Sequence, residues 1–459
     1  MRLLTIASRS LRQRLLTSVL TTVSILLGTG LVSFLWLVAD QAEKRYHASS
    51  KGYRVILGPK DTSPLGIVLS TVFHIGMNMG VIPLSVYRDV HDNPRWKRGN
   101  VGLRYAIPVV SGDNYKGFPI IGTTDEWFTM FSRDRDEEGK PIRPLEIVRG
   151  RRFAFGHADL LAEADEQVER IRIERGLEGN GETHDDHEIP KNYREAVLGA
   201  GVASKLGLGI GDRFVPAHGV EDSLLREEHE EAASEVVGIL EKTLTAIDQA
   251  IYVPIGLCYR VGGHNAVHPE EIEIDSGKVE ISAVIIDTKG PLGDQVLRSV
   301  FQRREGAQAA MPRVEIRTLF TMVGDITLAL RGISYLVLLV GAIAIFISLY
   351  NTMHERRREV AIMRSLGARR TQILGIVLLE ALLITGAGAI LGVLGSHTAA
   401  VMLGPRLESL TGVPVSGSVF GLREFYLILG VSFMGCLAGL LPAFLTSMTD
   451  VARHLSPDR

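Results

Sequence analysis

Four long apolar runs set the pattern of the chain, over residues 15–39, 332–353, 371–397 and 425–449. The second run contains 22 residues without a charged side chain, from Gly332 to Met353. At 1.5 Å per residue, a helix of that length crosses a bilayer core of roughly 30 Å. The pattern therefore predicts four transmembrane helices.

The long segment between the first two runs, residues 40–317, has the short apolar runs and turn residues of a folded aqueous domain. Runs rich in Val and Ile, each bounded by Gly, Pro or Asp, predict strands; they cover residues 53–57, 107–110, 119–121, 213–216, 235–240, 250–254 and 279–286. Residues 83–92 and 290–304 have patterns typical of helices. The expected fold class is an α-helical membrane protein with four transmembrane helices and a large mixed α/β extracytoplasmic domain between helices 1 and 2.

Helical periodicity also leads into the second span. Apolar residues recur at helical spacing over residues 318–331 without a proline, which predicts a stalk helix that continues into the membrane. A matching stalk is expected to extend the first span to about Ser49. By contrast, residues 159–195 contain twelve acidic residues, and this region is expected to be a mobile insertion with a charged helix before Arg175.

Charge then orients the predicted spans. The formal net charge is −2, but residues 40–331 contain 45 acidic and 36 basic residues, so the basic surplus flanks the membrane segments. Four arginines in residues 1–14 and six in the loop 354–370 place both in the cytoplasm by the positive-inside rule. Residues 398–424 are then an extracytoplasmic loop, and residues 450–459 are a cytoplasmic tail.

The remaining composition excludes several other classes of protein. The first run is longer than the roughly 7–15 apolar residues of a signal peptide, and no Ala-x-Ala-like site follows it, so we expect an uncleaved span. Cys258 and Cys436 lie in different kinds of segment and are not expected to pair. The surplus of basic residues flanks the apolar runs, so it is assigned to the membrane segments and not to a nucleic-acid surface.

The basic loop between the second and third spans has an amphipathic pattern. As a helix, it would place Val360, Ile362, Met363 and Leu366 on one side, with Arg357, Ala361 and Arg364 on another. Glu359 falls inside the apolar arc. The simplest structure is a short helix that lies at the membrane face.

These residues resemble a known family. Glu355-Arg-Arg-Arg-Glu-Val-Ala-Ile-Met-Arg-Ser-Leu-Gly-Ala-Arg-Arg370, followed by Leu378-Leu-Glu-Ala-Leu-Leu383, is similar to the FtsX-type permease domain shared by MacB, LolC/LolE and FtsX. Residues 194–214 and 236–240 resemble the MacB-type periplasmic core. The order of one span, a large extracytoplasmic domain and three further spans also matches this family.

The resemblance implies a non-enzymatic permease subunit that works as a homodimer or heterodimer with a cytoplasmic ABC ATPase. ATP and Mg²⁺ would bind to that ATPase, and no cofactor is expected on this chain, whose sequence contains no Gly-x-x-x-x-Gly-Lys-Ser/Thr motif. The loop 354–370 would be the coupling helix. Its site residues are Glu355, Arg356, Arg357, Arg358, Glu359, Val360, Ile362, Met363, Arg364, Leu366 and Gly367.

Other features have simpler interpretations beside the functional ones. The loop arginines also suit anionic lipid headgroups, and Glu359 is placed either to face the ATPase or to pair with Arg356. Glu380 is a charge within the third span, where the resemblance favours a structural contact between helices over a proton or substrate role. Two Gly-x-x-x-Gly pairs, Gly388 with Gly392 and Gly435 with Gly439, predict close helix packing, either in a dimer or, as we favour, within the chain.

No metal site is expected. The metal-capable side chains considered are those of His184, Asp185, Asp186, His187, His218 and His229. The first four lie in the acidic insertion, and no cysteine accompanies them, so the sequence favours weak or absent metal binding.

Three functions remain open at this point. The first is a permease of the bacterial inner membrane, with both termini cytoplasmic and a periplasmic domain, that moves a peptide, lipid, lipoprotein or drug outward. The second is an FtsX-like signalling subunit that activates a periplasmic partner such as a cell-wall hydrolase; a membrane sensor without an ATPase is a third interpretation. Expected partners include a periplasmic adaptor or substrate protein and membrane lipids, but no nucleic acid.

Overall fold

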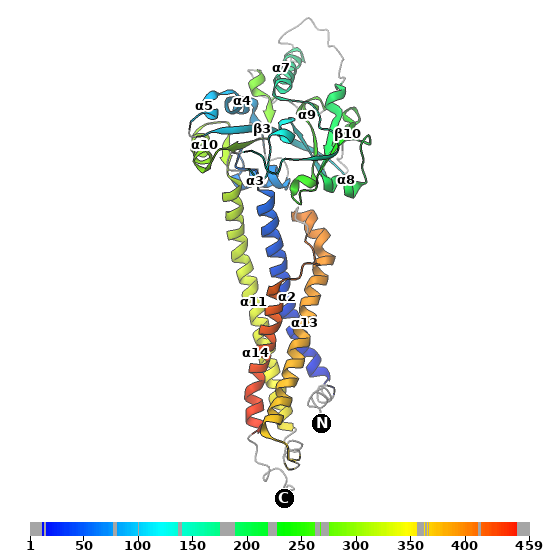
Figure 1. Ribbon diagram of the computed structural model, residues 1–459, viewed down its shortest axis with the longest axis vertical. Coiled ribbons are helices and arrows are strands. Elements are labelled where there is room, and N and C mark those ends of the chain that lie inside the picture. The colour runs from blue at the N-terminus through cyan, green and yellow to red at the C-terminus, as the bar shows by residue number, and fades with distance from the viewer. Residues whose placement is uncertain are drawn as a thin grey trace. The chain divides into compact units, whose positions relative to one another are not determined.

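The chain divides into two compact units, and each is described by itself. A computed structural model describes residues 12, 15–76, 80–99, 101–135, 140–174, 189–218, 227–261, 267, 275–355, 362, 365, 367–411 and 415–447. The helical unit combines residues Met1–Glu43 with Thr321–Arg459, and the sheet unit is Lys44–Phe320. Figure 1 labels the principal elements of both.

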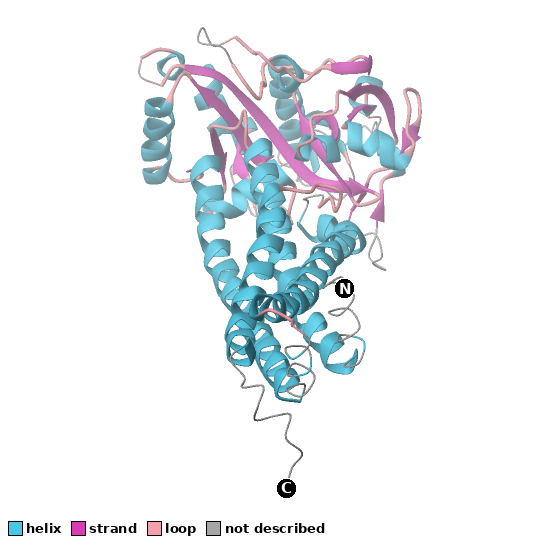
Figure 2. Cartoon of the chain, turned by 60° about the horizontal axis from the view of Figure 1, so that its bottom comes forward, coloured by secondary structure: helices cyan, strands magenta, loops and turns pink. Residues whose placement is uncertain are grey.

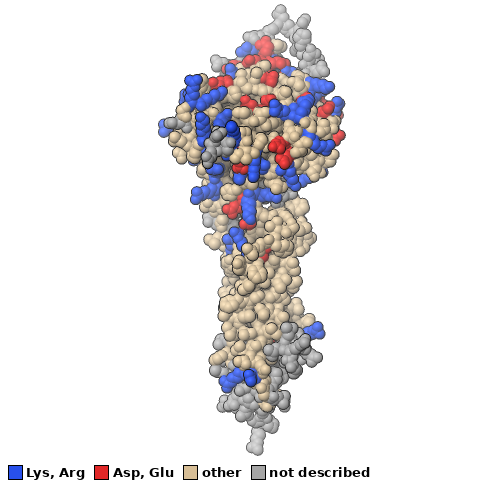
Figure 3. All heavy atoms as spheres, viewed as in Figure 1, with Lys and Arg blue, Asp and Glu red and all other residues tan. Residues whose placement is uncertain are grey.

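Four helices of the described residues are long and apolar enough to cross a membrane, which confirms the predicted number. They are α2 (Leu15–Ser49), α11 (Pro312–Glu355), α13 (Arg370–Thr411) and α14 (Leu422–Ser447). Their outward surfaces carry many exposed apolar side chains, including Leu336, Val340 and Phe433. Figure 3 shows the same helices as a surface with few charged side chains, which suits contact with lipid.

Two of these helices extend beyond their apolar runs, as the periodicity predicts. Helix α2 continues without interruption to Ser49, and α11 begins at Pro312, well before the uncharged run at Gly332. Each of the two helices therefore contains residues of both units. The predicted stalk, residues 318–331, is helical throughout.

The third span differs from the prediction at its far end. Residues 398–411, expected to begin an extracytoplasmic loop, continue α13 as helix, with Pro405 inside it. Ala399, Ala400, Met402 and Leu403 are helix-favouring residues. Helix α14 starts at Leu422 because the Gly421 N–H donates to the Glu424 carboxylate (2.6 Å), which caps the first turn.

The sheet unit is a mixed α/β structure (Figure 2). Its strands are β1 (Val55–Gly58), β2 (Ile82–Pro83), β3 (Leu103–Tyr115), β4 (Phe118–Thr123), β5 (Ile147–Gly150), β6 (Glu195–Leu198), β7 (Arg213–Phe214), β8 (Ala217–His218), β9 (Glu227–Glu228), β10 (Ser234–Leu240), β11 (Ile251–Pro254), β12 (Glu280–Ile281), β13 (Ala283–Thr288) and β14 (Gln308–Ala310). Its α-helices are α3 (Pro64–Phe73), α4 (Leu84–Asp92), α5 (Pro94–Lys97), α6 (Glu126–Thr129), α7 (His157–Glu174), α8 (Ala200–Leu206), α9 (Ile255–Arg260) and α10 (Pro291–Arg303).

The main sheet has the strand order β14-β1-β13-β3-β4-β11-β6-β10-β5. Its first strands pair antiparallel, with Ile285 of β13 opposite Ile107 of β3. The β4–β11 and β6–β10 pairs are parallel, which makes the sheet mixed. Strand β1 lies between β13 and β14, so the strands that begin and end this unit are hydrogen-bonded neighbours.

Each predicted strand run overlaps an observed strand, and helices α4 and α10 match the two predicted helices. The run 279–286 is divided into β12 and β13 at Ser282, whose N–H donates to the Val109 carbonyl (2.9 Å) and whose hydroxyl accepts from the Ser111 N–H (3.1 Å). Apolar residues of β6, β10 and β11 pack with helices α8 and α9 in one buried cluster; it includes Ala196, Leu198, Val202, Val236, Ile239, Ile251, Val253, Leu257 and Cys258.

The predicted charged helix before Arg175 is present as α7, and residues 189–195 include the 3-10 turn Lys191–Arg194 and the start of β6. Helix α7 buries Leu160 and Ala164, and Ile189 is also buried. Residues 175–188 lie outside the described residues. The physical reason for the order is Glu163, whose carboxylate is 1% exposed and accepts two hydrogen bonds from Arg260, at 2.8 and 2.7 Å.

Tyr193 and Gln167 complete the contacts of this carboxylate. The Tyr193 hydroxyl donates to Glu163 (3.0 Å), and the Gln167 amide donates at 2.7 Å. Desolvation and the nearby Glu163 charge raise the pKa of Tyr193, so its hydroxyl remains a neutral donor. This network fixes α7 to α9 through a buried, fully hydrogen-bonded charge.

We expect Glu163→Ala to destabilise the sheet unit by about 3 kcal/mol, because it removes one partner of a buried ion pair. Urea unfolding of the full chain in detergent, followed by fluorescence of Trp96 and Trp127, measures the change. Glu166→Ala is the matched control: Glu166 contacts the same Arg260 at 2.6 Å but is 53% exposed, so its loss should cost about 1 kcal/mol or less. Equal costs for the two variants would show that burial of the Glu163 carboxylate does not hold α7 in place.

Candidate functional site

The predicted coupling segment lies between the end of α11 and the start of α13. Glu355 is the last residue of α11. Of the other predicted residues, Ile362 is exposed, and Gly367 has the left-handed φ of 96°, which glycine adopts without strain. The rest of the predicted set lies outside the described residues: Arg356, Arg357, Arg358, Glu359, Val360, Met363, Arg364 and Leu366.

The chain re-enters a helix immediately after this segment. The Arg369 N–H donates to the side chain of Gln372 (2.9 Å), and the Gln372 N–H donates to the Arg369 carbonyl (3.0 Å). The Gln372 side chain thus reaches back to the N–H of the residue before the helix, which caps the start of α13 at Arg370. Two defined helix ends therefore bound the segment, and Gly367 permits the turn before the second of them.

Helices α2 and α13 approach closely at the first Gly-x-x-x-Gly pair. A Cβ atom at Gly388 would lie 2.9 Å from the side chain of Ile25, and one at Gly392 would lie 2.7 Å from the Leu26 carbonyl oxygen. The backbone of α13 therefore reaches a distance from α2 that only glycine allows. One turn further along, the hydroxyls of Ser33 and Ser396 form a buried hydrogen bond of 2.8 Å.

The second glycine pair lies on α14. A Cβ atom at Gly435 would overlap the side chain of Thr385 on α13, so this glycine lets α14 pack against α13. Gly439 is also buried. Both pairs thus occupy buried positions of the helical unit.

Glu380, the predicted charge within the third span, is buried in the same unit at 2% exposure. Its neighbours on α13, Val377, Ala381 and Ile384, belong to the apolar cluster that joins the four helices. The position favours the structural role that the resemblance implied. A proton or substrate role would require a path for water or substrate.

A polar cluster that sequence reasoning missed fixes the connection between α13 and α14. His397 contacts the Gly417 carbonyl through Nδ1 (2.7 Å) and the Glu424 carboxylate through Nε2 (3.1 Å), and its ring stacks on Phe420 at 3.9 Å. Gln41 of α2 forms two hydrogen bonds with the backbone of Ser416, both 2.8 Å. These contacts attach the connection to α2 through Gln41 and to α13 through His397. In the sequence, the local signal of this cluster was a histidine at the end of an apolar run.

The sheet unit contains a basic cavity of about 470 Å³, which sequence reasoning also missed. Seven basic and two acidic side chains line it, a positive excess of five; they are Lys51, Arg54, Arg104, Arg133, Arg135, Lys289 and Arg313, with Asp134 and Asp287. Such a cavity suits an anionic group. The residues are spread from Lys51 to Arg313, so no local sequence pattern reveals them.

Asp287 organises the arginines of this cavity. It is buried and lies 2.8 Å from Arg135 and 3.4 Å from Arg104. Burial raises the pKa of Asp287, and the arginine charges oppose that rise. Arg54 lies 3.9 Å from Asp287 and donates to both oxygens of Asp294, at 3.1 and 2.8 Å, which holds it at the cavity wall.

We expect Gly392→Leu to destabilise the helical unit by about 1–3 kcal/mol, since a larger side chain must separate α2 from α13. Gly395→Leu is the matched control on the same helix, because a Cβ atom there meets nothing within 4 Å. Denaturant titration of the full chain in detergent, followed by Trp36 fluorescence, reports on this unit, since Trp36 packs against its core. If the two variants unfold alike, the close contact is not a source of stability.

Comparisons with known proteins agree with this geometry. Residues 331–449 match the FtsX-like permease C-terminal family. The chain is 30% identical over 240 residues (49% of the chain) to the pyoverdine export ATP-binding/permease protein PvdT of Pseudomonas putida. It is 32% identical over 117 residues (26% of the chain) to the macrolide export ATP-binding/permease protein MacB of Nitrobacter winogradskyi. It is 30% identical over 129 residues (28% of the chain) to an uncharacterised ABC transporter permease of Methanocaldococcus jannaschii.

These matches cover only part of each relative. The matched segments span 33%, 17% and 31% of the length of those three proteins, respectively. They agree with the fold at the level of a multi-pass membrane protein with FtsX-like helices.

Proposed function

We propose that this chain, whose residues 331–449 form an FtsX-like permease domain, is a permease subunit that transmits motion from a separate cytoplasmic ABC ATPase to its extracytoplasmic sheet unit. ATP and Mg²⁺ would bind to the ATPase, and a second permease subunit, identical or related, would complete the membrane assembly. The proposed location is the bacterial inner membrane, with both termini in the cytoplasm.

The observation that carries the proposal is the continuity of α11. This helix runs for 44 residues from Pro312 to Glu355, a length of about 66 Å at 1.5 Å per residue. The coupling segment begins where the helix ends. A push on that segment therefore acts on one end of a stiff helix. The other end of this helix, Pro312, follows strand β14 almost directly in the chain.

The packing of the helical unit favours transmission of motion over passage of cargo through the helices. Close glycine contacts and the buried Ser33–Ser396 pair fill the space between α2 and α13. An aqueous path would need polar groups along its length. We therefore propose that the sheet unit, with a periplasmic adaptor or substrate protein, handles the cargo outside the cytoplasm.

The proposed cargo is a peptide, lipid, lipoprotein or drug that moves outward. Relatives named for pyoverdine and macrolide export support the direction of movement. The basic cavity supports cargo with an anionic group, since its lining has an excess of positive charge.

Replacing Val360 and Leu366 by Asp should reduce ATP hydrolysis by the co-reconstituted partner ATPase to the rate of that ATPase alone. Charges on the apolar side of the coupling helix would disrupt its contact with the ATPase, while insertion of the four spans should be unaffected. Ser365→Asp is the control, because Ser365 is exposed and lies outside the apolar arc. Unchanged stimulation in the Val360→Asp and Leu366→Asp variants would remove the coupling role from this segment.

A second test concerns the stalk. Seven glycines inserted after Thr321 should break α11, whereas seven alanines add about two helical turns and keep the helix. We expect the glycine variant to retain ATPase stimulation but to lose the ATP-dependent signal of a fluorophore at Leu292→Cys, which is exposed on α10. The Cys436→Ser background leaves only buried Cys258.

The alanine variant serves as the control in this test and should retain the signal. An ATP-dependent signal that survives the glycine insertion would show that α11 is not the path of transmission. That result would leave the coupling test above unaffected.

A further inference from the structure

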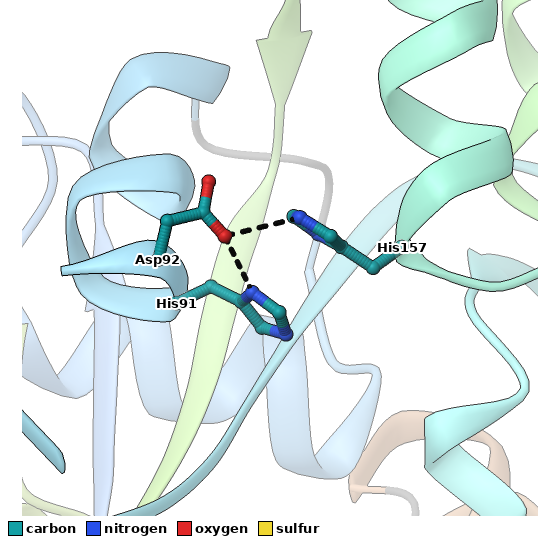
Figure 4. Close-up of side chains that lie close together, drawn as sticks. All are labelled: His91, Asp92 and His157. Atoms are coloured by element: carbon teal, nitrogen blue, oxygen red, sulfur yellow. Dashed lines mark hydrogen bonds and ion pairs between the residues drawn. The ribbon is translucent and has the colours of Figure 1, made fainter. Parts of the chain in front are cut away.

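Three side chains with metal-binding capacity meet at the contact between α4 and α7 (Figure 4). His91 and Asp92 are the last two residues of α4, and His157 is the first residue of α7. Figure 4 shows one oxygen of the Asp92 carboxylate facing a nitrogen of each imidazole ring. The potential ligand atoms all lie within 4.8 Å of one another.

Their spacing is close to that of ligands around one ion. One oxygen of Asp92 lies 2.8 Å from Nδ1 of His91 and 3.1 Å from Nε2 of His157. Around a tetrahedral Zn²⁺ with bonds of about 2.0–2.2 Å, ligand atoms lie about 3.3 Å apart. The two rings also stack, with centroids 3.9 Å apart and an angle of 21° between their planes.

The other nitrogen of each ring also faces an oxygen atom. Nε2 of His91 lies 3.5 Å from the Glu126 carboxylate, and Nδ1 of His157 lies 2.8 Å from the Tyr87 hydroxyl. Histidines that bind metals use their second nitrogen in this way, since an outer carboxylate or hydroxyl fixes the ring and its tautomer. The site therefore has the outer contacts of a metal centre as well as its ligands.

Access to solvent is compatible with uptake of an ion. The side chain of Asp92 is 46% exposed, and those of His91 and His157 are 19% and 22% exposed. A hydrated ion can reach the three ligand atoms from outside, and water can occupy a fourth position. Two imidazoles with one carboxylate form a ligand set that Zn²⁺ favours.

We propose that His91, Asp92 and His157 bind one Zn²⁺ ion, with Glu126 and Tyr87 as positioning residues. The ion would join the end of α4 to the start of α7. This site differs from the metal-capable residues that the sequence singled out: His184–His187 lie outside the described residues, and His229 is buried beside Glu231. It is also independent of the proposed coupling to an ATPase.

The test uses the full chain in detergent, without a histidine tag and after treatment with a chelator. Calorimetric titration with zinc chloride should show that one ion binds per chain. A thermal scan with zinc present should show a raised temperature of unfolding. His157→Ala and Asp92→Asn should weaken binding by at least 100-fold. Glu126→Gln should weaken it by about 10-fold, as expected for an outer contact. His47→Ala should bind as the unaltered chain does, because His47 is an exposed histidine elsewhere in this unit.

A second measurement keeps the test decisive if a ligand variant fails to fold. Co²⁺ bound to the unaltered chain should give the visible absorption bands of a four- or five-coordinate nitrogen and oxygen site, and zinc should displace it. Absence of saturable zinc binding by the unaltered chain would overturn the proposal. Equal binding by folded His157→Ala would also overturn it, because the ion would then lie elsewhere.

Discussion

The absence of water from the bilayer core is the constraint on which the rest of this structure depends. Within lipid, each backbone polar group must find its partner inside the chain, so the spans are uninterrupted helices. Even the small polar side chains obey this rule: Thr21, Thr22 and Thr385 each donate to the carbonyl four residues earlier. The hydrophobic effect does not draw such helices together, because lipid is as apolar as they are. The helices must instead be held together by close packing of their side chains and backbones.

That requirement explains where the small residues lie. Gly30 meets the backbone of Gly392, and Ser33 meets Ser396, so α2 and α13 share a contact built from residues with little or no side chain. Dispersion forces and a buried hydrogen bond replace the hydrophobic driving force there. The polar cluster around His397 then fixes the connection to α14. Such close contacts between the helices are compatible with the transmission of motion that we propose.

The sequence predicted those features that depend on local patterns. Uninterrupted apolar length identified the four spans, and periodicity identified the stalk of α11. The helix before Arg175 was expected, but the contact that holds it could not be predicted, because Glu163 and its partner Arg260 are 97 positions apart. The basic cavity was missed for the same reason, since its lining comes from distant segments. The coupling segment lies mostly outside the described residues, so its role remains a prediction.

The pairing of β1 with β14 has a consequence for how such proteins diversify. Ile56 lies opposite Ala310 in this pair, so the sheet unit begins and ends on adjacent strands. A domain with adjacent ends can be inserted into a host protein without disturbing the host fold. The sheet unit therefore resembles a domain inserted between two helices. Evolution or protein engineering could therefore exchange it for another domain while the four long helices keep their sequence.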